Sequence, residues 1–259
     1  MQRDSEIKFN SIPREQHLPA TDVAAVSLAC DFLRQAKVKK CDLLSNGSNY
    51  VFLATLAKDQ VQVKAIYKPR QGEAPLWDFP DGTLYKREYA AFRVSQDLGW
   101  PLIPPTVIRE GPHGIGSMQW FVETVRWSRD QLQTEDSILL RQVALFDILV
   151  NNADRKAGHF LQGKDGRLWL IDHGLTFNAM PKLRTVLWDF SGEHIPEALL
   201  KDVKAFQDKL RGERRLREAL LRQLAASEVA ALESRIDAIL EKPVFASPSS
   251  IRSVPWPWF

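Results

Sequence analysis

The chain has 259 residues, of which 44% are hydrophobic and 26% charged, and its formal net charge is +3. This composition is typical of a globular protein that forms one large domain or two lobes sharing a cleft. A net charge this small gives no reason to expect a nucleic-acid partner or an anionic membrane surface.

Three further features bear on where the protein works. The polar segment 1–14 lacks the apolar core of a signal peptide, and no window approaches the roughly 20 apolar residues that a membrane-spanning helix needs. Cys30 and Cys41 are too few for a disulfide framework. We therefore predict a cytoplasmic protein without stable membrane insertion, in which both cysteines are buried thiols.

The first half of the sequence predicts a sheet with one internal helix. Thr21 is suited to cap a helix through about Gln35, with Val23 on its apolar side. A polar turn at 45–49 lies between two extended segments. The elements expected after it are strands over 50–56 and 61–68, a helix capped by Thr83 that ends near Leu98, and strands over 103–109 and 118–123. That makes about five strands before residue 124.

The second half is mainly helical. Apolar residues with a 3.6-residue period predict helices over 134–149, 196–210, 214–226 and 227–242. Between the first two, residues 158–171 indicate a hairpin with its turn at Gly163–Gly166. We therefore expect a β-rich part at 1–123 and a helical part at 124–259. The aromatic segment 255–259 is expected to pack on its own domain, with a partner-binding tail as the alternative.

Two polar segments of the second half carry the chemistry. The first is residues 152–159, with sequence NADRKAGH, and the second is residues 172–174, with sequence DHG. The hairpin folds Asp172 back beside His159 and Asp154, so that two carboxylates and an imidazole converge. Phosphoryl transfer needs one carboxylate to deprotonate the acceptor hydroxyl and another to hold the metal on the phosphates. We interpret the chain as a kinase with an α+β, bilobal, protein-kinase-like fold.

Glu88 gives an independent test of this outline. It lies along a mostly apolar face of the helix that begins at Thr83. A buried carboxylate is costly without a cation. Lys68, at the end of a strand, is likewise costly to bury without an anion. A Lys68–Glu88 pair solves both and would place the ammonium against the α- and β-phosphates of ATP. The alternative is a solvated Glu88 and a Lys68 that snorkels to the surface.

The motifs together resemble the phosphatidylinositol 3-/4-kinase-related group, which includes the HipA-like bacterial kinases. The resemblance rests on AIYKP at 65–69, the helix with Glu88, NADR at 152–155 and IDHG at 171–174. The chain is most similar to bacterial phosphatidylinositol-kinase-like proteins, which share stretches like PLWDFPDGTL at 75–84 and DHGLTF at 172–177. The resemblance covers roughly residues 40 to 195.

The resemblance implies ATP and Mg²⁺ or Mn²⁺ as cofactors, and a role for each matching residue. Lys68 would hold the α- and β-phosphates, Glu88 would orient Lys68, Asp154 would face the acceptor hydroxyl and Asp172 would bind the metal. Ser48 and Asn49 would lie over the phosphates. The strand and hinge at 118–125, which contain Gln119, Glu123 and Val125, would meet adenine through their backbone.

Two positions depart from the pattern of the group. The group has an Asn metal ligand where this chain has His159, and it has His where this chain has Lys156. His159 has three open roles: a ligand to manganese, a cationic contact to phosphate, or a space-filling residue. Lys156 would offset charge on the transferred phosphoryl group, with a solvated loop residue as the alternative.

These observations leave more than one function open. A kinase would phosphorylate a protein Ser or Thr or a small metabolite, because Lys182 and Arg184 are too few cations for a lipid headgroup pocket. A nucleotide-binding pseudokinase scaffold and a nucleotidyltransferase are the alternatives. We also expect Asp147 to brace the catalytic loop by accepting backbone N–H bonds and His173 to pack rather than react. Residues 70–78 form either a flap over the cleft or a packed surface insert.

Overall fold

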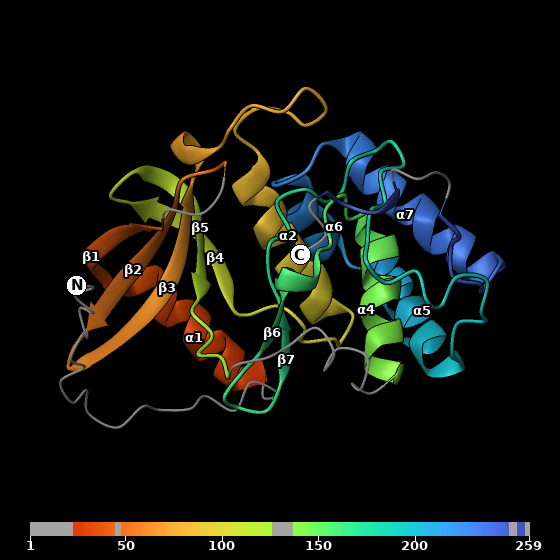
Figure 1. Cartoon of the computed structure of the whole chain (residues 1–259), viewed down its shortest axis with the longest axis horizontal. Coiled ribbons are helices and arrows are strands. Elements are labelled where there is room, and N and C mark those ends of the chain that lie inside the picture. The colour runs from red at the N-terminus through yellow and green to blue at the C-terminus, as the bar shows by residue number, and fades with distance from the viewer. Residues whose placement is uncertain (1–22, 45–47, 126–136, 249–252, 257–259) are drawn as a thin grey trace, which may run out of the picture.

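The computed structural model describes residues 23–44, 48–125, 137–248 and 253–256. A twisted sheet and two helices form its N-terminal part, and helices form most of its C-terminal part (Figure 1). The predicted α+β architecture is therefore confirmed. Within the described residues, no helix is both long enough and apolar enough to cross a bilayer.

The N-terminal sheet has five strands, and all its neighbouring pairs are antiparallel. The strand order is β1-β2-β3-β5-β4. The strands are β1 (Lys37–Leu44), β2 (Val51–Lys58), β3 (Val61–Pro69), β4 (Thr106–Gly111) and β5 (Gly114–Trp120). The last two begin and end away from their predicted bounds. Pro104 and Pro105 have no N–H for a ladder and delay β4, and Gly114 at φ +82° closes a tighter turn into β5.

The two faces of the sheet have different neighbours. Paired residues share a face, so the register places Phe52, Tyr67 and Met118 together on one face, where all three are buried. The same alternation places Lys68 and Gln119 on the opposite face. This second face is the one from which Lys68 reaches the candidate site.

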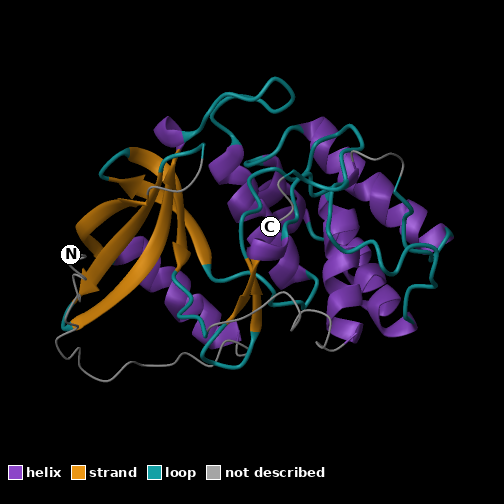
Figure 2. Ribbon diagram, viewed as in Figure 1, coloured by secondary structure: helices purple, strands orange, loops and turns teal. Residues whose placement is uncertain are grey.

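The helices and the short hairpin complete the fold (Figure 2). The helices are α1 (Val23–Gln35), α2 (Leu84–Asp97), α4 (Ser137–Val150), α5 (Glu197–Gly212), α6 (Arg214–Leu221) and α7 (Ala226–Glu241). The predicted hairpin is present as β6 (Phe160–Gln162) and β7 (Leu168–Leu170), which pair antiparallel. Two 3₁₀ turns are also present. The first, η1 (Arg70–Gly72), follows β3, and the second, η2 (Ala157–His159), precedes β6.

Several local predictions need correction. Val23 is 83% exposed rather than packed on the core, and Thr21 lies outside the described residues. Thr83 does not cap α2 with its side chain. Instead the Glu73 carboxylate accepts the backbone N–H groups of Leu84 and Tyr85, at 3.0 and 2.8 Å. The segment before α2 therefore supplies the anion that the first turn of a helix favours.

The cysteine and tail predictions were partly right. Cys30 and Cys41 are both free thiols, but only Cys30 is buried, because Cys41 lies on the edge strand β1. The tail packs on its own chain through Ser253, whose carbonyl accepts bonds from the Thr185 N–H and the Trp188 indole at 3.1 and 3.0 Å. Trp256 stays 85% exposed, and residues 257–259 lie outside the described residues.

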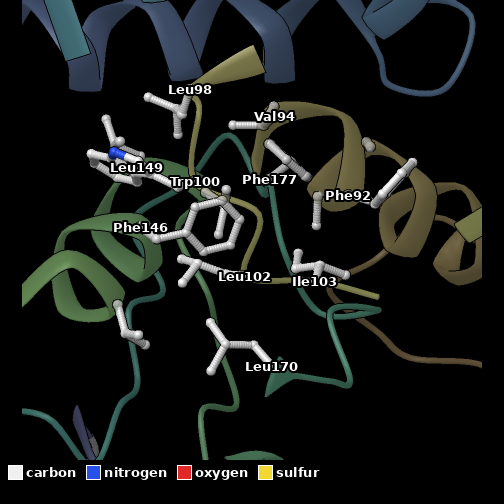
Figure 3. Close-up of a cluster of buried hydrophobic side chains, with 14 of the residues drawn as sticks. Phe92, Val94, Leu98, Trp100, Leu102, Ile103, Phe146, Leu149, Leu170 and Phe177 are labelled. Carbon is white, nitrogen blue, oxygen red and sulfur yellow. The ribbon is translucent and has the colours of Figure 1, made fainter. Parts of the chain in front are cut away.

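One hydrophobic core runs through both parts of the molecule. Figure 3 shows Phe146 of α4 among side chains from α2, from the segment after α2 and from β7. Phe92, Trp100, Leu102 and Phe177 in this cluster are each at most 4% exposed. Helix α2 is thus packed against the C-terminal part as well as against β4 and β5 of the sheet.

Candidate active site

Lys68 lies at the centre of the site. Its ammonium donates to Glu88 Oε1 and, at 3.0 Å, to Asp172 Oδ1. The other oxygen of Glu88 accepts the backbone N–H of His173 at 3.0 Å. Strand β3, helix α2 and the segment after β7 are therefore joined by one chain of charged hydrogen bonds, although Lys68 and Asp172 are 104 residues apart. The solvated alternative for Glu88 is excluded, since its side chain is 3% exposed.

The charges in this chain stabilise one another. Burial alone would lower the pKa of Lys68, but the carboxylates of Asp172 and Glu88 raise it above its ordinary value. The Lys68 ammonium in turn holds the pKa of Asp172 far below its usual range. Asp172 is therefore ionised at neutral pH, and its half-exposed side chain is open to a ligand.

The backbone at Asp172 is in the left-handed region, with φ +61°. Asn151 and Phe177, on either side of the same site, also have positive φ. Non-glycine residues adopt this region at a cost of about 1 kcal/mol or more, so they persist only where surrounding contacts hold them. Here the pairing with Lys68 and the bond from His173 N–H to Glu88 hold the turn at Asp172.

Asp154 and Lys156 form a second pair, with Lys156 Nζ 3.0 Å from Asp154 Oδ2. Burial raises the pKa of Asp154, and the Lys156 ammonium opposes that shift. The Asp154 N–H is held by the side chain of Asn152 at 3.0 Å, which fixes the start of the loop. Lys156 is therefore bound to the carboxylate beside it rather than solvated.

His159 faces Asp172, with its Nε2 3.5 Å from Asp172 Oδ2. Burial lowers the pKa of His159 to about 4, although the nearby Asp172 charge acts in the opposite direction. The imidazole is therefore neutral at physiological pH, which disfavours its role as a cationic phosphate contact. Its Nδ1 accepts the Lys156 N–H at 3.4 Å, so the neutral ring carries its proton on Nε2, and binding a metal through Nε2 would require that proton to leave.

The loop that carries Asp154 is braced from α4 by Asp147. This buried carboxylate accepts the Arg155 guanidinium at 3.0 to 3.2 Å and the Asn152 side-chain amide at 2.9 Å. The prediction that Asp147 braces the loop is right, but its partners were wrong, because they are side chains and not backbone N–H groups. A buried carboxylate is best satisfied by a charged fork, which the neighbouring Arg155 supplies.

Arg155 also links this loop to the DHG segment. It donates to the carbonyl of Ile171 at 3.1 Å and lies 2.7 Å from His173 Nε2. His173 is fully buried against Phe146, and burial lowers its pKa well below the usual value. Its neutral ring accepts from Arg155 and packs, as predicted. The importance of Arg155 was missed, although its place directly after Asp154 is a sequence signal.

The turn between β1 and β2 is only partly described. Ser48 is exposed, and residues 45–47 lie outside the described residues. Asn49 accepts the Ala74 N–H through its side chain at 2.7 Å, and the Tyr50 N–H donates to Gly72 at 2.8 Å. The structure therefore fastens this turn to the segment after β3, and the Asn49 oxygen that was expected over the phosphates is bound to the chain.

The predicted hinge follows β5 but is occupied by the hairpin. The Glu123 carbonyl accepts the Lys164 N–H at 2.8 Å, and the Val125 N–H donates to Gln162 at 3.0 Å. Gln119 is buried on the Lys68 face of the sheet and donates to Thr106 Oγ1 at 2.9 Å. The Glu123 carbonyl and the Val125 N–H are thus bonded within the chain, and contact of this segment with adenine stays a prediction.

The residues fit a metal that arrives with phosphates better than a metal held by protein alone. No group of three or more His, Cys, Asp or Glu side chains surrounds a common point within the described residues. The two candidate ligand atoms, Asp172 Oδ2 and His159 Nε2, lie 3.5 Å apart. Mg²⁺ in nucleotide sites takes one or two protein ligands and completes its shell with phosphate and water oxygens, and Mn²⁺ tolerates an imidazole.

The segment 73–83 is a loop between η1 and α2 that extends outward from the molecule (Figure 1). Its Phe79 packs with Leu84 and with Ala153, the residue before Asp154. Asp78 forms an ion pair with Lys182 at 2.9 Å, and Trp77 is 91% exposed beside the same lysine. The loop 73–83 therefore packs against the residue before Asp154 through Phe79 and is exposed to solvent at Trp77.

The fold and the arrangement of Lys68, Glu88 and Asp172 define a protein-kinase-like chain. Hydra Fam20, solved with sugar, matches 85% of this chain and 89% of its own, with a TM-score of 0.54 and 13% identity. The Golgi casein kinase with Mn and ADP bound matches 85% of this chain and 75% of its own, with a TM-score of 0.52 and 14% identity. At these identities the similarity shows the fold alone.

In sequence, the chain is 39% identical over 252 residues to Protein Rv2133c of Mycobacterium tuberculosis. The alignment covers 83% of this chain and 90% of that protein. The chain belongs to the family of Protein Rv2133c. No protein-family model matches it. The expected membership of the phosphatidylinositol 3-/4-kinase-related or HipA-like group is not established by these similarities, which support the kinase-like fold.

Proposed function

We propose that this protein is an atypical ATP-dependent kinase that transfers the γ-phosphate of ATP to a hydroxyl acceptor. The observation that carries the proposal is the double engagement of Lys68, which bonds Glu88 of α2 and Asp172 of the DHG segment at the same time. Three elements far apart in sequence converge on one ammonium. A cluster of this kind, with one carboxylate open to solvent and the pKa values of its groups strongly shifted, is typical of a functional site.

The nucleotide side of the site follows from these charges. Lys68 holds the α- and β-phosphates, and Glu88 keeps the ammonium in place. Asp172 holds the Mg²⁺ or Mn²⁺ that accompanies ATP, with the neutral His159 as a second ligand. The metal supplies neutralisation of the phosphate charge. The Mn and ADP in the Golgi casein kinase support this assignment by analogy of fold.

The acceptor side uses Asp154 and Lys156. Asp154 orients the acceptor hydroxyl and takes its proton as the hydroxyl oxygen bonds to the γ-phosphorus. The bond from the γ-phosphorus to the β,γ-bridging oxygen breaks, and ADP leaves with the electron pair. Lys156, 3.0 Å from the Asp154 carboxylate, lies where it offsets the charge of the transferred group.

A protein Ser or Thr or a small metabolite is the proposed acceptor. The motif order of Lys68, Glu88, Asp154 and Asp172 is the basis for proposing a relationship to the phosphatidylinositol 3-/4-kinase-related and HipA-like kinases. A lipid headgroup is disfavoured because Lys182, one of the two cations between the DHG segment and Trp188, is already paired with Asp78.

His159 favours a second candidate, a pseudokinase that binds nucleotide and acts as a scaffold. An imidazole stands where the resembled group has an amide ligand, and a site with a weakened metal position binds ATP without turning it over. The retention of Asp154, with its partner Lys156, favours the kinase over the scaffold, because a scaffold has no need of a catalytic base.

The test is incubation with γ-labelled and, separately, α-labelled ATP in the presence of magnesium or manganese. We expect γ-label to move to protein or water in the wild type and to be lost in Asp154→Ala, while nucleotide affinity stays within a few-fold. Asp172→Ala should weaken metal-dependent nucleotide binding as well. Asp208→Ala, an exposed carboxylate of α5, is the matched control and should keep wild-type turnover.

The other outcomes separate the alternatives. Transfer of α-label would show a nucleotidyltransferase. Nucleotide binding without turnover in any condition would favour the scaffold. Turnover in Asp154→Ala within a few-fold of wild type would overturn the assignment of the base.

A further inference from the structure

Arg87 is a buried charged residue that the proposed chemistry does not use. Its side chain is 1% exposed, and the residue directly precedes Glu88 on α2. It donates to Glu228 Oε1 of α7 at 2.6 Å and to the carbonyl of Thr176 at 2.6 Å. Its Cζ also lies 4.9 Å from the centroid of the Phe79 ring. Arg87 is thus bonded to the C-terminal helices and to the segment just after the DHG motif.

Glu228 is held in place from its other side. Its second carboxylate oxygen accepts the backbone N–H of Ala225 at 2.9 Å, which caps the start of α7. The ion pair therefore joins the start of α7 in the C-terminal part to the first turn of α2. Both charged groups have several hydrogen bonds, the condition under which a buried pair has a defined geometry.

The far end of α2 is fastened as well. The Trp100 indole donates to Asp202 of α5 at 2.7 Å, and the Leu170 N–H of β7 donates to the Leu102 carbonyl at 2.8 Å. Figure 3 shows the side chains after α2 packed around Phe146 of α4. Near the site, the directional contacts of α2 with other segments include those of Arg87 and the bonds from the Leu84 and Tyr85 N–H groups to Glu73.

Rotation of α2 matters because Glu88 has two partners. Its oxygens bond Lys68 and the N–H of His173 on opposite sides, and successive helix residues are about 100° apart. A turn or shift of α2 that released Arg87 from Glu228 and Thr176 would move Glu88 away from both partners. The bonds of Arg87 therefore determine the position of Glu88.

We infer that Arg87 is a positioning residue that locks α2 onto the C-terminal part through Glu228 and Thr176 and so keeps Glu88 engaged with Lys68. The inference rests on the proposed function. It follows that contacts that hold α2 in this position are supplied by the chain itself. The contacts that do this lie within the same chain and are buried from solvent.

The test compares Arg87→Met with Arg93→Met, a substitution on the same helix of an arginine whose partner Asp97 is also on α2. We expect Arg87→Met to lower kcat by about 10- to 100-fold, the effect of a misplaced catalytic group, while Arg93→Met stays within about twofold. Arg87→Lys keeps the charge but loses the fork, so it should recover part of the loss. Circular dichroism verifies that each variant is folded.

A second pair covers the case in which Arg87→Met does not fold. Glu228→Gln keeps shape and weakens the bond to Arg87. Its matched control is Glu233→Gln, a partly exposed glutamate of α7 whose partner is Arg217 of α6. Glu228→Gln should lower kcat more than its control. If both folded variants, Arg87→Met and Glu228→Gln, keep kcat within about twofold of their controls, Arg87 is merely structural and the inference is wrong.

Hydrogen exchange separates this inference from the proposed function. In the wild type we expect slow exchange across α2 without nucleotide, and in Arg87→Met we expect faster exchange in α2 but not in β2 and β3. This result would support the lock even if no phosphoryl transfer were found. Equal exchange of α2 in wild type and Arg87→Met would overturn it.

Discussion

The two sides of the candidate site differ in how their residues are used. On the phosphate side, Lys68, Glu88 and Asp172 bond one another across three elements. On the adenine side, Gln119 bonds Thr106, and the Glu123 and Val125 backbones bond the β6–β7 hairpin. The first three residues meet at the Lys68 ammonium, whereas these groups of the second set bond other parts of the chain.

This difference shows in which part of a site the residue types of the sequence can predict the structure. The phosphate side depends on charges that must find partners when they are buried, so residue type restricts the structure. Contacts to a base are usually made by backbone N–H and C=O groups, which every residue carries. The adenine side therefore has no residue requirement that a sequence reveals. The following predictions test the contrast.

The largest effect is expected from Glu88→Gln, which removes a buried charge from Lys68. Without that charge Lys68 shifts towards Asp172, and kcat/KM for ATP should fall by about 100-fold. Steady-state kinetics with ATP as the varied substrate measures the loss. Glu110→Gln on β4 is the control and should behave as wild type. A loss below threefold would show that the phosphate side is structural as well.

A smaller effect is expected from Lys156→Gln on the pH dependence. Burial raises the pKa of Asp154 and Lys156 lowers it, so removal of the ammonium raises that pKa further. Asp154 acts as a base only above its pKa. The acidic limb of the kcat/KM profile should therefore move to higher pH in Lys156→Gln. An unchanged limb would mean that another group controls it.

The smallest effect on catalysis is expected from Gln119, on the proposed adenine side, and from Asn49, in the turn between β1 and β2. Gln119→Leu and Asn49→Ala each remove a side-chain hydrogen bond within the chain, and each should cost about 1 kcal/mol of unfolding free energy. KM for ATP should stay within about threefold of wild type. Urea unfolding and steady-state kinetics measure the two quantities. A large rise in KM without lost stability would place the altered residue in contact with nucleotide instead.

The sequence indicated more of the phosphate side than of its supports. The expected Lys68–Glu88 pair is present, and the hairpin does return Asp172 to His159. The partners of Asp147 were wrong and Arg87 was missed. Arg87 looks in sequence like any helix arginine, because nothing local shows that Glu228, 141 residues later, will face it.

Strand β1 shows the same limit at the level of fold. Four of its eight residues are Lys or Asp, and the strand is largely exposed at the sheet edge, so it lacks the alternation that predicts a half-buried strand. Its pairing with β2 is decided by backbone hydrogen bonds. These depend on a neighbour already being in place.

By itself, the sequence determined the order of the helices and strands and the residue types that a phosphate site requires. Both depend on local periodicity and on the cost of burying a charge without a partner. Only the tertiary structure decided which charge meets which and how α2 is held. Those contacts join residues far apart along the chain, and packing of the whole core selects them.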